Sequence, residues 1–243
     1  MSQLPLILLP GLLSDQTIFR YQVNTLKKVT KVQVITLNDV NSPELMTNKI
    51  LQLAPERFML AGHSLGGWVA LRIMKIAPHR VSKLCLMNTS IEKLEAKEIT
   101  ERQSTLTRIE KGEFYEIACE LVDKFIFNVN VRQRVLNMFL QAGKQSLINQ
   151  TQAMIQRENL HEVLPTICCP TWVIHSEQDK RFSFETVNEI SNLIPRSMFK
   201  IIHRCGHMSP IECPETVTEI LKKWIECVVP PICTGSDRSL NND

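Results

Sequence analysis

The segment 62–67 reads Gly-His-Ser-Leu-Gly-Gly and places a serine where a strand pattern changes into a helix pattern. Residues 57–61 before it form a short apolar run, and apolar residues recur at near-helical spacing from Trp68 to the proline at position 78. A serine on such a corner adopts a strained backbone and projects its hydroxyl above the sheet, while bulky neighbours would clash with the adjacent strand and helix. This Gly-x-Ser-x-Gly pattern is typical of a nucleophile elbow, so Ser64 is the candidate nucleophile.

Continuous apolar runs alternate with helical patterns on both sides of this segment. Continuous rather than alternating hydrophobicity indicates strands that are buried on both faces, as in a parallel sheet covered by helices. We therefore predict an α/β fold with a mainly parallel sheet of about six strands flanked by helices. The predicted strands are 6–9, 32–37, 57–61, 81–87, 171–174 and 198–202. The predicted helices are 17–27, 42–53, the helix after Ser64, 184–193 and 214–228.

The middle of the chain has a different pattern. Residues 91–164 contain no convincing strand, and their apolar residues recur at helical spacing. We interpret this segment as an all-helical cap inserted before the last two strands. Residues 1–90 and 165–229 then form the α/β core, and the polar residues 230–243 are expected to be a flexible C-terminal tail.

Composition excludes several classes of partner. The 243 residues carry a formal net charge of +3 without a clustered basic stretch, which does not favour nucleic-acid binding. No apolar run reaches membrane-spanning length, so we expect no membrane insertion. The apolar residues 4–13 contain two prolines and lack a preceding positive region, which predicts a strand and loop rather than a signal peptide. We expect a cytoplasmic monomer or homodimer that acts on a small molecule.

The eight cysteines do not suggest a disulfide framework or a metal site. They are scattered without a Cys-x-x-Cys pair, as expected for reduced thiols of a cytoplasmic protein. The grouping of His203, Cys205, His207 and Cys213 matches none of the structural zinc spacings. We therefore expect neither a metal nor an organic cofactor.

A serine hydroxyl needs a base that takes its proton. His207 follows a glycine on the loop after the last predicted strand, and an α/β sheet builds its site from loops at the carboxyl ends of its strands. The chain order Ser, Asp or Glu, then His also fits the elbow architecture. We therefore assign the base to His207, ahead of the other five histidines. These are His63, His79, His161, His175 and His203.

The residue that orients the base should lie between Ser64 and His207. Only two aspartates do, and Asp123 falls within an amphipathic helix of the cap, where a charged residue usually faces solvent. Asp179 follows the strand 171–174 in a turn, with Glu177 as a nearby competitor. The loop after the fourth strand, Asn-Thr-Ser at 88–90, offers no carboxylate. Asp179 is therefore the predicted acid.

Two backbone N–H groups are needed to stabilise the oxyanion that develops during acyl transfer. One is expected from Leu65, directly after the nucleophile and at a helix N-terminus, where the dipole favours negative charge. The other is expected from Leu12, which follows Pro-Gly on the loop after the first strand. We also predict apolar walls that suit an acyl or alkyl group of modest size. The predicted substrate-binding residues are Leu13, Met208, Phe114 and Phe139.

Taken together, the loop at 9–12, the elbow, the cap insertion, Asp179 and the Gly-His-Met at 206–208 resemble the α/β-hydrolase superfamily over nearly the whole chain. The elbow and histidine loops look especially like small carboxylesterases, enol-lactone hydrolases and carrier-ester esterases of the compact, helix-capped branch. One departure is the Pro-Gly at 10–11, where many relatives carry His-Gly. The hydrogen bonds beneath that loop must therefore differ here.

The sequence thus favours a serine hydrolase that cleaves a small to medium carboxylic ester through an acyl-enzyme. The same triad also serves carbon–carbon bond hydrolysis, lactone opening, thioester cleavage and cofactor-free perhydrolysis, and the fold does not separate them. A ring-cleavage substrate would need a partner for its carboxylate, such as Arg157 or Arg102, but we predict both to be surface arginines. A third alternative is a non-catalytic binder on the same fold, against which an intact triad argues.

Overall fold

A computed structural model describes residues 4–227, so the tail expected at 230–243 lies outside the described residues. Its centre is a six-stranded sheet in the order β2-β1-β3-β4-β5-β6, in which every pair of neighbouring strands is parallel. The predicted α/β class with a parallel sheet is confirmed. The strands are β1 (Leu6–Leu9), β2 (Val32–Val34), β3 (Phe58–His63), β4 (Val81–Met87), β5 (Thr171–Ser176) and β6 (Ser197–Ile202).

The inner strands are continuous apolar runs because helices cover both of their faces. All residues of β1, β3 and β5 are buried, whereas in β6 at the sheet edge only Ile202 is buried. In register, Leu8 pairs with Ala61, Ala61 with Cys85, and Met87 with Ile174. The second strand is shorter than predicted: it ends at Val34, although Ile35 still donates a backbone hydrogen bond to Leu8.

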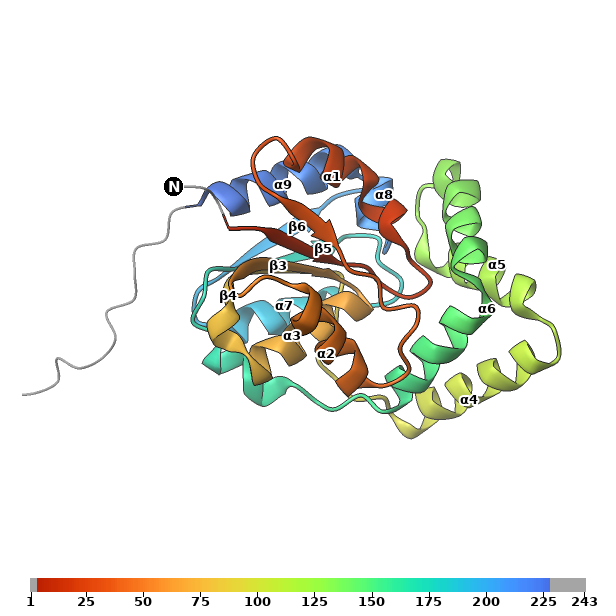
Figure 1. The fold of residues 1–243 in the computed structure, drawn as a ribbon. Coiled ribbons are helices and arrows are strands. Elements are labelled where there is room, and N and C mark those ends of the chain that lie inside the picture. The colour runs from red at the N-terminus through yellow and green to blue at the C-terminus, as the bar shows by residue number, and fades with distance from the viewer. Residues whose placement is uncertain (1–3, 228–243) are drawn as a thin grey trace, which may run out of the picture.

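Helices pack on both faces of this sheet (Figure 1). On one face lie α1 (Arg20–Leu26), α8 (Ser209–Glu212) and α9 (Pro214–Glu226), and on the other lie α2 (Pro43–Leu53), α3 (Leu65–Ile76) and α7 (Phe184–Leu193). The helix predicted over 17–27 is divided, because a 3₁₀ turn, η1 (Gln16–Phe19), capped by Asp15, precedes α1. The short α8 was not predicted. A further 3₁₀ turn, η2 (Pro78–Arg80), follows α3.

The sheet order contains a topological switch. The chain leaves β1 for β2 at the edge, then returns to place β3 on the other side of β1. The loops after β1 and β3 therefore diverge and leave a crevice at the carboxyl ends of these two strands, where α/β sheets bind ligands. The predicted oxyanion loop and the elbow are these two loops.

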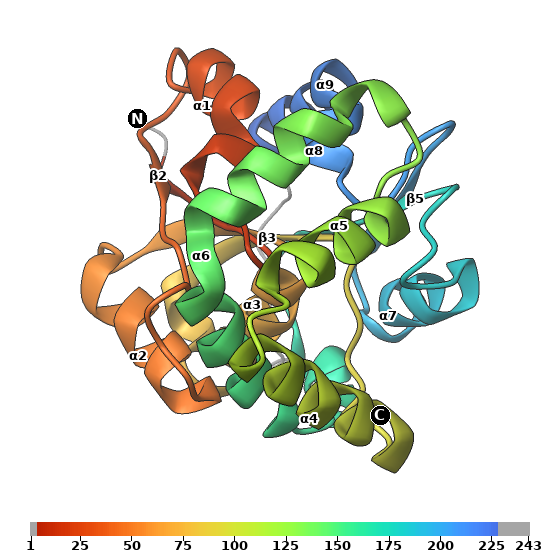
Figure 2. The same cartoon turned by 90° about the vertical axis from the view of Figure 1, so that its right-hand side faces the viewer.

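Three helices cover this end of the sheet. They are α4 (Ala96–Glu110), α5 (Phe114–Phe125) and α6 (Arg132–Ile155), with the 3₁₀ turns η3 (Val129–Val131) and η4 (His161–Thr166) beside them. Figure 1 shows them at one side of the sheet, and Figure 2, turned to face that side, shows them crossing in front of it. The helix α6 is kinked at Gly143, where φ is 84°.

The covering segment leaves and rejoins the core at one place. The backbone N–H of Leu160 donates to the carbonyl of Ile91 (3.1 Å), so the two ends of the segment lie side by side. Farther out, the buried Gln150 of α6 accepts from the N–H of Leu13 (2.8 Å) and donates to the side chain of Asn38 (2.9 Å). The cap is thereby fastened to the loops after β1 and β2. No helix among residues 4–227 is long and apolar enough to cross a membrane.

Candidate active site

Ser64 occupies the sharp corner between β3 and α3. Its φ of 53° and ψ of −117° lie outside the ordinary conformations of a residue with a side chain, so the corner is strained. Its N–H donates to Met87 of β4 (2.9 Å), and the hydroxyl of Thr89 donates to its carbonyl (2.7 Å). Both bonds hold the backbone of the elbow to the neighbouring strand and the loop after it.

The glycines around Ser64 are required by close backbone contact. A Cβ atom on Gly62 would lie 2.3 Å from the carbonyl oxygen of Gly66, and one on Gly66 would lie 2.2 Å from that of Leu9. Neither oxygen belongs to a flexible side chain that could move aside. The elbow therefore packs against β1 more closely than any other residue type would allow.

Ser64, His207 and Asp179 form one hydrogen-bonded relay. The Nε2 atom of His207 lies 2.9 Å from the Oγ of Ser64, and its Nδ1 lies 2.9 Å from the Oδ2 of Asp179. The side chains of His207 and Asp179 are almost fully buried. With the carboxylate accepting from Nδ1–H, the tautomer that results leaves Nε2 free to accept the serine proton.

Asp179 is held in its charged form. Burial raises the pKa of this carboxyl, but the attraction of His207 and hydrogen bonds from His207, Asn88 and the backbone of Arg181 outweigh burial and lower the pKa to about 2. The Nδ2 of Asn88 donates to Oδ2 (2.9 Å), and the N–H groups of Arg181 and Phe182 donate to Oδ1 (2.7 and 3.2 Å). Four donors thus fix both oxygens of the acid.

The competing carboxylates lie elsewhere. Asp123 is exposed on α5 and pairs with Arg132 (2.7 Å). Glu177 accepts from the ring of His203 (3.2 Å) at the surface. Neither is hydrogen-bonded to His207.

Asn88 and His63 are site residues that the sequence reasoning missed. Asn88 has a φ of 47°, and its Oδ1 accepts from the hydroxyl of Ser209 (2.8 Å), which turns its amide towards Asp179. The Nε2–H of His63 donates to the carbonyl of His207 (2.7 Å). Burial and repulsion from His207 lower the pKa of His63 to about 3, so its ring is neutral. Their positions in the sequence are the signal that could have found them. His63 ends the strand that leads into the elbow, and Asn88 directly follows the neighbouring strand β4.

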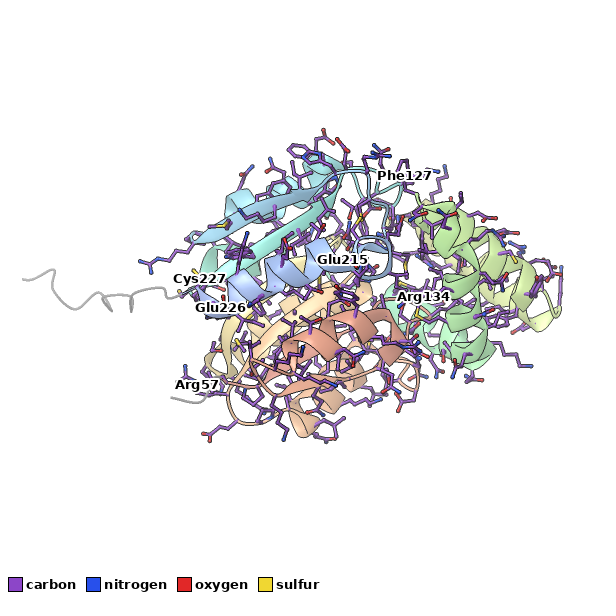
Figure 3. All side chains as sticks on the ribbon, turned by 90° about the horizontal axis from the view of Figure 1, so that it is seen from above. Arg57, Phe127, Arg134, Glu215, Glu226 and Cys227 are labelled. Atoms are coloured by element: carbon purple, nitrogen blue, oxygen red, sulfur yellow. The ribbon has the colours of Figure 1, made fainter. Side chains whose placement is uncertain are left out.

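The loop that carries His207 is fastened to the cap by the buried carboxylate of Glu212. This side chain accepts from the N–H groups of Phe127 (2.8 Å), Asn128 (2.9 Å), Gly206 (3.3 Å) and Met208 (3.0 Å). Two of these amides belong to the cap and two to the histidine loop. Figure 3 labels Phe127 at this junction.

The α5 helix ends against the same loop. The N–H of His207 donates to the carbonyl of Phe125 (2.8 Å), the last residue of α5. The ring centroids of Phe125 and Phe182 lie 4.9 and 5.6 Å from that of the His207 imidazole. The base is therefore packed between the cap and the loop after β5.

Two backbone N–H groups near Ser64 are available to a ligand. Among residues 4–227, neither the N–H of Leu12 nor that of Leu65 has a hydrogen-bond partner. Leu65 begins α3, so its N–H also lies at the positive end of the helix dipole. A Cβ on Gly11 would lie 3.0 Å from that of Ser64, which shows how closely the loop after β1 approaches the elbow.

The pocket over Ser64 differs from the predicted one. Its walls are Leu12, Ser64, Leu65, Arg102, Phe125, Met154, Arg157, Arg181 and Phe182. The four predicted wall residues are absent from this set. Leu13, Met208 and Phe139 are packed in the core, and Phe114 packs against it at the far end of α5. The backbone of Leu13 turns at a φ of 51°, so the side chain that faces the pocket is that of Leu12.

The arginines correct a second expectation. Arg157 is buried rather than at the surface, with its guanidinium over the ring of Trp68 (5.0 Å). Its Nη2 donates to the carbonyl and hydroxyl of Ser90 (3.0 and 3.2 Å). Arg102 is partly buried and lines the same pocket. Sequence spacing could not reveal this, because the cap folds both side chains inward.

The residues that the structure describes contain no set of side chains suited to bind a metal ion. No group of three or more His, Cys, Asp or Glu side chains among residues 4–227 could hold a metal ion. His207, one of the four residues considered above as a zinc grouping, is instead hydrogen-bonded to Ser64 and Asp179.

No protein-family model matches the sequence, and neither does any curated protein. Solved structures do match. An esterase from Thermogutta terrifontis, with malate bound, has a TM-score of 0.84 and 25% identity, over 92% of this chain and 90% of its own. The enol-lactonase from Burkholderia xenovorans LB400 has a TM-score of 0.83 and 17% identity, over 93% and 92%. A bromoperoxidase from Bacillus anthracis has a TM-score of 0.78 and 18% identity, over 93% and 92%.

Proposed function

The chain has the fold of the α/β-hydrolase superfamily, and from this premise we propose that it is a serine hydrolase that cleaves a small to medium carboxylic ester. The observation that carries the proposal is the relay from Ser64 through His207 to Asp179, with both hydrogen bonds at 2.9 Å. The relay lies at the carboxyl ends of the strands, where this kind of sheet builds its sites. Esterases among the similar structures add support.

In the proposed acylation step, His207 Nε2 takes the hydroxyl proton of Ser64 while Oγ attacks the ester carbonyl carbon. The negative charge that develops on the carbonyl oxygen is stabilised by the N–H groups of Leu12 and Leu65. His207 then gives its proton to the alkoxy oxygen as the carbon–oxygen bond breaks and the alcohol leaves. Asp179 stabilises the imidazolium throughout and remains ionised, in keeping with its low pKa.

Deacylation repeats these steps with water. His207 takes a proton from the water molecule, whose oxygen attacks the acyl carbon, and a second oxyanion forms at the same two N–H groups. The proton returns to Ser64 Oγ as its bond to the acyl carbon breaks, which releases the carboxylic acid. The chain's own groups supply every proton transfer in this cycle.

The test is hydrolysis of a chromogenic short-acyl ester such as 4-nitrophenyl butyrate. Ser64→Ala should lower kcat at least ~10⁴-fold, because removing the nucleophile of a triad leaves only binding and oxyanion stabilisation. A fluorophosphonate should label Ser64 in the native protein, as located by mass spectrometry of the tryptic peptides. Full turnover by Ser64→Ala would overturn the proposal. Absence of both labelling and hydrolysis would favour a non-catalytic binder.

A further inference from the structure

The pocket over Ser64 is lined by three arginines and by no carboxylate. They come from separate parts of the chain: Arg102 from α4, Arg157 from the segment after α6, and Arg181 from the loop after β5, two residues beyond Asp179. Two further pockets share these residues. Arg181 and Arg102 line one together with Glu98 and Glu101, and Arg181 and Arg157 line the other together with Glu92 and Glu98, so that carboxylates occur only in these outer pockets and not in the one over Ser64. The arginines therefore form a continuous wall from the nucleophile outwards.

Their charges are poorly compensated. Arg181 is 3.4 Å from Glu98, but Arg102 and Arg157 have no ion pair among residues 4–227. The guanidinium of Arg157 bonds only to the neutral Ser90, and its buried Nε has no partner. The guanidinium of Arg102 makes no hydrogen bond within the described residues. Donors therefore remain free on two of the three side chains.

Such an arrangement is unfavourable without a ligand. Burial together with repulsion from Arg181 and Arg102 lowers the pKa of Arg157 to about 9, and burial with repulsion from Arg181 lowers that of Arg102 to about 10. At these pKa values Arg102 and Arg157 are still charged at neutral pH. Like charges gathered in a partly dry pocket cost free energy, which an anion would recover through charge-assisted hydrogen bonds.

We propose that Arg102, Arg157 and Arg181 bind an anionic oxygen group, a carboxylate or a phosphate, carried by the substrate a few atoms from its scissile carbonyl. The proposal rests on the proposed ester hydrolysis at Ser64, which lies in the same pocket. The planar guanidinium fits either anion through paired N–H donors. The substrate is then an acidic ester, and Phe125, Met154 and Phe182 pack around the chain that joins its two ends.

The experiment compares esters that differ only in charge. Mono-4-nitrophenyl adipate carries a carboxylate at the far end of its acyl chain, and its terminal carboxamide has the same shape without charge. A third ester carries a terminal phosphate and distinguishes the two anions. In the native protein, kcat/KM for at least one anionic ester should exceed that of the carboxamide ~10-fold or more. Equal values for all three esters would overturn the proposal.

Substitutions of the arginines test whether these side chains cause the preference for the anionic ester. Arg157→Met and Arg102→Met should each lower kcat/KM for the preferred anionic ester ~10-fold, while the carboxamide ester changes less than ~2-fold. Arg134→Met is the matched control, since Arg134 is exposed on α6 (Figure 3) and outside the pocket. Equal losses on charged and neutral esters would overturn the proposal. If Arg157→Met does not fold, Arg157→Lys and the more exposed Arg102→Met decide.

Binding to Ser64→Ala separates this proposal from the proposed function. Calorimetry on that variant should show the preferred anionic ester binding ~10-fold more tightly than the carboxamide, and the preference should disappear when Arg157→Met is added. Anion-selective binding without hydrolysis by the native protein would retain the arginine site and reject the esterase. Hydrolysis of all three esters at one rate, with equal binding to Ser64→Ala, would retain the esterase and reject the arginine site.

Discussion

The carboxyl edge of the sheet and the cap above it are built on different physical terms. At the edge, hydrogen bonds and close packing hold Ser64, Asp179 and His207 in place: glycines allow the sharp corner at Ser64, four donors surround Asp179, and two rings enclose His207. The cap contributes side chains from segments far apart in sequence, and its charged groups Arg102 and Arg157 lack ion pairs among residues 4–227. In the proposed function, the edge supplies the chemistry of ester cleavage and the cap selects the substrate.

The sharpest way to test this division exchanges carboxylates for amides in both regions. Asp179→Asn should lower kcat on 4-nitrophenyl butyrate by ~10⁴-fold, because the amide no longer stabilises the tautomer and the charge of His207. The matched variant Asp123→Asn removes the cap carboxylate that pairs with Arg132, and it should leave kcat within ~2-fold. Comparable losses in the two variants would end the distinction between edge and cap.

Replacing one glycine in each region by alanine compares how tightly the sheet edge and the cap are packed. Gly66→Ala should lower the free energy of unfolding by about 3 kcal/mol or more, because its Cβ would lie 2.2 Å from the carbonyl oxygen of Leu9. Gly112→Ala, between α4 and α5, meets no atom within 4 Å but has a φ of 91°, so it should cost about 1–2 kcal/mol. Urea unfolding measures both. A Gly66 variant as stable as the Gly112 variant would contradict the tight contact at the elbow.

The smallest effect concerns the neutral His63 beneath the base. Its folded-state pKa of about 3 lies below the ordinary value of 6.5, so the unfolded chain binds more protons between these pH values. Stability should therefore fall as pH falls through this window, by about 2 kcal/mol from pH 7 to pH 5 for this residue.

His63→Gln keeps a donor for the carbonyl of His207 but does not titrate, so its unfolding free energy should lose that part of the pH dependence. The exposed His79→Gln is the control and should retain the native pH profile. Identical pH profiles for the native protein and His63→Gln, measured by urea unfolding, would show that His63 is not held neutral.

The sequence predicts the sheet edge better than it predicts the cap. The strands, the elbow and the positions of His207 and Asp179 could be predicted because strand runs, glycines and loop positions are local signals. The roles of Asn88 and His63 depend on which loops become neighbours in the sheet, which no local pattern specifies.

The cap was predicted least well. Phe114 and Phe139 were expected in the pocket from their apolar character, yet the same character places them against the core. Arginine is ordinarily exposed, so Arg157 was expected at the surface. The guanidinium of Arg157 lies over the ring of Trp68 because α6 and the segment after it carry this residue to the inner side of the cap.

The carboxylate of Glu212 has a kinetic consequence. It joins amides of the α5–α6 junction to amides of the loop that carries His207, and separating them would leave a buried charge without donors. The position of the junction is therefore coupled to the position of His207. If this end of the cap were lifted, His207 would be drawn away from Ser64 as well, so the proposed proton transfer would be confined to the assembled state. Under the proposed mechanism, substrate and product would be exchanged past a cap that stays anchored at this end.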